Sequence, residues 1–89
     1  MSLRRFTVVH GQRFESRLAM LWLKDRRVQK AMDELEPVLQ AIPDQAGKTF
    51  HFEGLEYWHI THASYELIYQ ILEEDCQVRL IDVRLSPTR

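Results

Sequence analysis

Two of the chain's four histidines, His59 and His62, lie three residues apart in the segment LEYWHITH. Histidine is the side chain that most readily transfers protons near neutral pH, and a pair of histidines can also hold a metal ion. The segment alternates in polarity, which predicts a strand, so the two side chains should point to opposite faces. No further ligands follow at a recognisable spacing, so the sequence predicts no metal site and no cofactor.

The same alternation sorts the residues of the predicted strands into two faces. Trp58 and Ile60 should face the core, together with an apolar set in the next strand that contains Tyr65, Leu67, Tyr69 and Ile71. In the last strand Ile81 and Val83 are assigned inward. The open face then collects a mixed polar set: Tyr57, His59, Glu66, Gln70, Asp82 and Arg84.

These polar types match the needs of RNA self-cleavage, which requires a base for the 2′-hydroxyl, a cation for the developing charge and an acid for the leaving oxygen. His59, Glu66 and Arg84 are therefore the catalytic candidates, although the charge of Glu66 would also repel phosphate. The candidates for substrate binding are Lys48, Tyr57 and Arg79. The alternative for each is an ordinary solvated side chain.

The length, composition and charge of the chain limit the kind of fold that can position these residues. The chain has 89 residues, is 45% hydrophobic and contains one cysteine, which predicts one domain over residues 1–89 without an internal disulfide. It shows no membrane span and no signal peptide, so we expect a cytoplasmic protein. Twelve basic residues against 13 acidic ones give no overall attraction for nucleic acid, so any basic patch must come from the fold.

The order of elements along the chain is predicted as β-α-α-β-β-β. A strand over 5–10 precedes a helix from Gln12, and Asp25 is placed to cap a second helix. Pro37 should kink or briefly break that helix and Pro43 should end it. Three strands follow at 55–62, 63–72 and 78–85, with a tight turn at 62–64, and the connection before them has room for a short strand at 48–52. The fold class is α+β, a helix hairpin packed on a mostly antiparallel sheet.

The segment ASYELIYQILEEDCQVRLIDVRLS and the helix VQKAMDELEPVLQAIP with its glycine-containing exit resemble the RelE/ParE toxin superfamily of bacterial type II toxin–antitoxin modules. The resemblance covers roughly residues 5–86 and concerns fold more than activity. It implies a small toxin that an antitoxin protein neutralises, a kind of protein also linked to plasmid stabilisation. RelE-like members cleave mRNA in the ribosomal A site, whereas ParE-like members inhibit DNA gyrase.

Several positions depart from the nuclease pattern of the superfamily. Glu66 stands where RelE-like nucleases often have a basic residue, and Tyr57 and His59 stand where they place lysines. The late arginine of the family would fall on Arg84 or Arg89, and no tyrosine-bearing tail follows. These departures and the balanced charge favour an alternative, a non-catalytic module of the same fold that binds an antitoxin-like partner. A third reading is an α+β domain of unrelated function.

Overall fold

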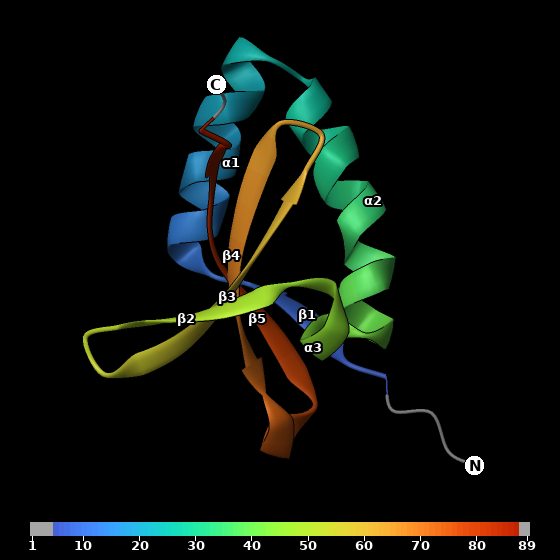
Figure 1. Cartoon of the computed structure of the whole chain (residues 1–89). Coiled ribbons are helices and arrows are strands. Elements are labelled where there is room, and N and C mark those ends of the chain that lie inside the picture. Colours follow the sequence, from blue (N-terminus) through green and yellow to red (C-terminus); the bar gives the residue numbers. More distant parts are fainter. Residues whose placement is uncertain (1–4, 88–89) are drawn as a thin grey trace.

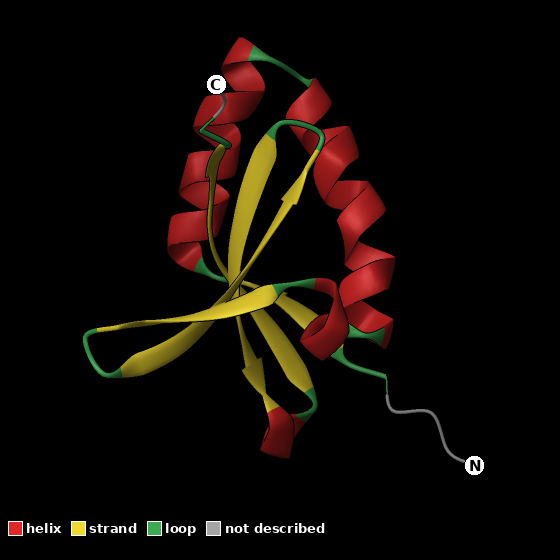
Figure 2. Ribbon diagram, viewed as in Figure 1, coloured by secondary structure: helices red, strands yellow, loops and turns green. Residues whose placement is uncertain are grey.

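The structure, a computed structural model, describes residues 5–87 and places two long helices on one face of a five-stranded sheet (Figures 1 and 2). The elements are β1 (Thr7–His10), α1 (Gln12–Lys24), α2 (Arg27–Ala41), α3 (Pro43–Ala46), β2 (Lys48–Phe52), β3 (Leu55–His62), β4 (Tyr65–Leu72), a 3₁₀ turn (Glu73–Asp75) and β5 (Gln77–Leu85). The strand order is β1-β5-β4-β3-β2, with β1 parallel to β5 and the other pairs antiparallel. The predicted α+β class is confirmed, and the predicted order of elements is found with one further strand, β2, and one further short helix, α3.

The helix hairpin forms largely as its sequence pattern predicts. Asp25 accepts the backbone N–H of Arg27 at 3.0 Å, which satisfies one of the unpaired donors at the start of α2. The helix α2 runs through Pro37 without the expected break, and Leu35 and Leu39 are buried on either side of the proline. Pro43 comes after the end of α2, as expected, but it also begins the short helix α3, which the sequence analysis did not predict.

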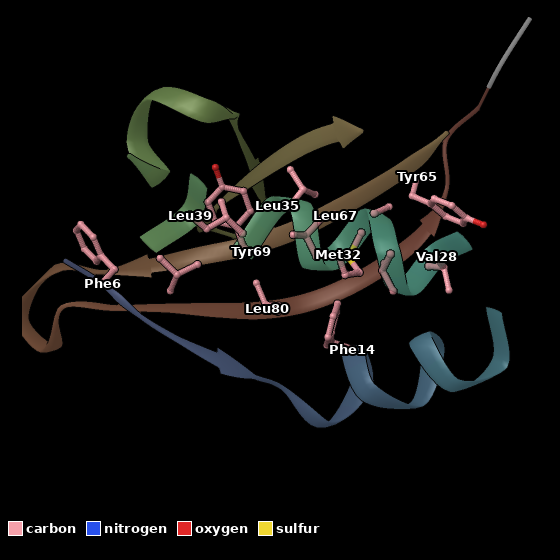
Figure 3. Packing of buried hydrophobic residues seen from close by; sticks show 13 residues of the cluster. Phe6, Phe14, Val28, Met32, Leu35, Leu39, Tyr65, Leu67, Tyr69 and Leu80 are labelled. Carbon is pink, nitrogen blue, oxygen red and sulfur yellow. The ribbon is translucent and has the colours of Figure 1, made fainter. Parts of the chain in front are cut away.

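Thirteen buried hydrophobic residues fill the space between the helices and the sheet (Figure 3). Phe14 of α1, Leu39 of α2 and Leu67 of β4 are among the most buried. Trp58 and Ile60 pack against this core, as predicted, and Trp58 stacks on Tyr69. Trp22 of α1 also falls on an apolar helix stripe, but it is 38% exposed and its ring lies beneath the guanidinium of Arg26.

A β-bulge in β5 overturns the predicted facing of Ile81. Ile68 pairs with Asp82 and Tyr69 pairs with Leu80, so Ile81 is an extra residue with no partner across the ladder. Val78 and Leu80 point into the core before the bulge and Val83 points into it afterwards. Strict alternation cannot bury all three, which explains why the assignment of Ile81 is wrong and that of Val83 is confirmed.

The β2–β3 and β3–β4 hairpins have two-residue turns with positive φ. Ala63 and Ser64 connect β3 to β4 with φ of 51° and 74°, and Glu53 and Gly54 connect β2 to β3 with φ of 53° and 81°. Such turns match the twist of the strands that they join. The β2–β3 hairpin projects away from the helices (Figure 1), and β2 is an edge of the sheet.

Candidate active site on the open face of the sheet

Three of the predicted residues form one hydrogen-bonded chain across three strands. Glu66 of β4 receives Arg84 Nε of β5 on Oε1 at 2.6 Å, and its Oε2 lies 3.1 Å from Nδ1 of His59 on β3. The Glu66 side chain is only 12% exposed, whereas His59 is 35% exposed. Both carboxylate oxygens are engaged, so Glu66 orients the imidazole ring and the guanidinium together.

The pairing with Arg84 changes how the negative charge of Glu66 acts. At a separation of 2.6 Å the guanidinium balances the carboxylate, and the bond uses Nε of Arg84. The two terminal nitrogens have no hydrogen-bond partner among residues 5–87 and are therefore available to an anion. The repulsion of phosphate that the sequence suggested is correspondingly reduced.

Beside the hydrogen-bonded residues His59, Glu66 and Arg84 the sheet has a hollow with a volume of about 360 Å³. Aromatic rings, two isoleucines and three charged side chains line it: Phe50, Phe52, Tyr57, Ile68, Ile81, Arg13, Asp82 and Arg84. Phe50 stacks on Tyr57 and meets His59 edge to face, each at 5.6 Å between ring centroids. The hollow therefore offers flat apolar surfaces close to an imidazole and an arginine, a combination suited to a stacked ring and a phosphate.

The bulge brings a second carboxylate to the open face. Asp82 is 14% exposed and lies 3.3 Å from Nε of Arg13 and 3.6 Å from Nε of Arg17, both on α1. Its Oδ1 also accepts the N–H of Val83 at 2.8 Å. Asp82 thus links the first two turns of α1 to the edge of β5.

The predicted substrate-binding residues all lie on the open face but do not meet at one point. Lys48 is opposite His59 in the β2–β3 register, and Tyr57 lines the hollow. Arg79 lies on the other side of the bulge, opposite Gln70. The other predicted position for the late arginine, Arg89, lies outside the described residues.

The other histidines lie away from this site. His62 points to the helix side, as predicted, with Nε2 2.7 Å from a carboxylate oxygen of Glu34 on α2. His10 and His51 lie near the carboxylates of Glu15 and Glu56. Among residues 5–87 no three His, Cys, Asp or Glu side chains gather in a way that could hold a metal ion.

Sequence reasoning missed Arg13, Arg17 and Phe50 as parts of this region. The two arginines are four residues apart, so a shared helix face was visible in the sequence. Nothing in the sequence, however, connects the polar face of α1 to Asp82, because that contact depends on the bulge. Phe50 was only part of a short predicted strand, and its contacts depend on the register of β2 with β3.

No protein-family model matches the chain, and a comparison with curated proteins found no match. Among solved structures, a chain in the crystal structure of the toxin–antitoxin complex RelBE2 from Mycobacterium tuberculosis is similar, with a TM-score of 0.80 and 23% sequence identity. The match covers 91% of this chain and 98% of that chain. No helix within residues 5–87 has the length and apolar character to cross a membrane. The structural match to this chain of the RelBE2 complex confirms the fold that was expected from the resemblance to RelE/ParE toxins.

Proposed function

We propose that this protein is the toxin of a type II toxin–antitoxin module and that it stops translation by cleaving mRNA on the ribosome. The observation that carries the proposal is the chain His59–Glu66–Arg84 on the open face, beside an aromatic hollow. A solvated interaction surface has no need of a carboxylate at 12% exposure that holds an imidazole and a guanidinium. The protein would act in the cytoplasm, where ribosomes are found.

We assign each residue a role that its contacts and its position in the sheet support. His59 takes the proton of a ribose 2′-hydroxyl, whose oxygen then attacks the adjacent phosphorus. Arg84 offers its terminal N–H groups to the phosphoryl oxygens as negative charge builds on them. The bond to the 5′-oxygen breaks, and that oxygen takes a proton from Lys48, the residue opposite His59, to leave a cyclic phosphate and a 5′-hydroxyl. Glu66 is a positioning residue that acts through the other two.

We further propose that the toxin is neutralised by an antitoxin protein. The similar fold was found in a toxin–antitoxin complex, which supports a partner of this kind. The outer surface of α1 also leaves Met20, Trp22 and Leu23 exposed, and an amphipathic partner segment that folds on binding could cover them. A short reading frame beside the gene that encodes such a segment would agree with the proposal.

Purified protein added to a reconstituted translation reaction tests the nuclease. We expect mRNA cut at ribosome-occupied codons, mapped by primer extension, and a fall of about 10²–10⁴-fold in the cleavage rate of His59→Ala, the usual range for a lost proton-transfer group. His62→Ala is the matched control, because His62 is on the same strand and also contacts a glutamate, but on the opposite face.

Intact mRNA in the wild-type reaction would refute the nuclease, and equal losses in the two histidine variants would refute the role of His59. A supercoiling assay with DNA gyrase then examines the ParE-like activity. Inhibition there would move the target from translation to gyrase. Binding of an antitoxin without either activity would instead support the non-catalytic module.

A further inference from the structure

The open face contains more positive charge than the sequence balance suggests. Three guanidiniums, from Arg13, Arg17 and Arg84, approach two largely buried carboxylates, Asp82 and Glu66. In all three cases Nε is the guanidinium nitrogen nearest to the carboxylate, and the terminal nitrogens make no hydrogen bond to another of residues 5–87. The cluster carries a net charge of about one positive unit, whereas the whole chain has a net charge of −1.

Two of these arginines come from a helix and have no role in the proposed chemistry. Arg13 lines the same hollow as the aromatic residues Phe50 and Tyr57, and Arg17 follows it one helical turn later. Without a partner such side chains would extend from α1 into solvent, since arginine has several rotatable bonds. The contact of both with one largely buried carboxylate, Asp82, places them at the rim of the sheet.

We propose that Arg13 and Arg17 form a second phosphate-binding arm, which Asp82 positions and which holds single-stranded RNA beside the reacting phosphate. The inference rests on the proposed function and adds to it a substrate contact on α1. A phosphodiester bound there would lie on the β5 side of the hollow, next to Arg84, and a neighbouring base could lie against Phe50 and Tyr57 on β2 and β3. Terminal N–H groups of arginine suit phosphate oxygens, and aromatic faces accept any base.

Binding of a fluorescein-labelled single-stranded RNA, followed by anisotropy at several salt concentrations, tests the arm without requiring cleavage. Each lost phosphate contact to a single strand lowers the slope of log K against log salt by about 0.7, so the Arg13→Gln/Arg17→Gln variant should lose about 1.4. The matched control is Lys24→Gln/Arg26→Gln, which removes the same charge at the last residue of α1 and at the N-cap of α2 and should keep nearly the full slope. Circular dichroism melting checks that both variants are folded.

A salt slope that falls only in the Arg13→Gln/Arg17→Gln variant supports the arm, whether or not the translation assay shows cleavage. Equal slopes in both variants, or no binding by the wild-type chain at low salt, would overturn it. Arg13→Lys/Arg17→Lys separates positioning from charge. Lysine keeps the positive charge, but its single amino nitrogen cannot pair with Asp82 and bind a phosphate in the way that the several nitrogens of arginine can. The affinity for RNA should therefore fall, while the slope of log K against log salt stays near the wild-type value. Wild-type affinity in that variant would overturn the positioning role of Asp82.

Discussion

Gly47 lies where the chain enters β2, and we predict that its replacement by alanine destabilises the whole fold. A Cβ built at this position would be 2.5 Å from the hydroxyl of Tyr69 and 2.6 Å from the backbone oxygen of His59, where ordinary contact begins at 3.4 Å. Tyr69 is fully buried and donates its hydroxyl to the carbonyl of Pro43 at 2.7 Å. Neither neighbour can move without loss, because one is in a buried hydrogen bond and the other is strand backbone.

The expected magnitude follows from these two contacts. Displacing the tyrosine hydroxyl leaves a buried polar group unsatisfied, at a cost of about 1–3 kcal/mol, and overpacking adds about 1–3 kcal/mol. We therefore expect Gly47→Ala to lower the free energy of unfolding by about 3 kcal/mol. For a domain of this size that loss corresponds to a fall of roughly 12–24 °C in Tm.

Urea denaturation followed by circular dichroism measures this loss. Gly54→Ala is the control, because Gly54 has open space around it and only its φ of +81° opposes a side chain, at a cost of about 1–2 kcal/mol. Tyr69→Phe removes one of the two obstructing atoms, so the double variant with Gly47→Ala should lose less stability than the sum of the single changes. A smaller loss for Gly47→Ala than for Gly54→Ala, or strict additivity, would refute the reasoning.

Three further predictions concern stability. Replacing Ala63 and Ser64 by Asn-Gly should raise the free energy of unfolding by about 1–2 kcal/mol, because both residues have positive φ, and chemical denaturation would show it. Hydrogen bonds from Arg27 lower the pKa of Asp25 from 3.8 to about 2. The stability that this pair contributes is therefore fully present above about pH 4 and is lost as the pH falls toward 2. Asp25→Asn should make the free energy of unfolding depend less on pH between these values. Burial raises the pKa of Tyr69 to about 12 from 10.0, so stability should fall between about pH 10 and 12, and Tyr69→Phe should reduce that fall.

Most of the elements, and the side of most strands that faces the core, could be predicted from the amino-acid pattern alone. Periodicity predicted both long helices, and alternation in β3 and β4 placed Trp58 and Leu67 inward and His59 and Glu66 outward. The prediction succeeds because burial of apolar area is the largest favourable contribution to the free energy of folding. The apolar residues of each helix or strand lie on one side of it, so that side must face the core. The continuity of α2 through Pro37 shows the limit of local rules, since burial of Leu35 and Leu39 outweighs the lost hydrogen bond.

The way in which the polar residues combine depends on the three-dimensional packing of the strands and helices. The bulge at Ile81 appears when β5 must bury Val78, Leu80 and Val83 against one core, and that requirement depends on the register with β4. The same bulge sets Asp82 on the open face within reach of Arg13 and Arg17. Glu66 contacts His59 and Arg84, which are seven and 18 residues away in sequence. Long-range pairing of this kind depends on strand register and helix placement, which local composition does not encode.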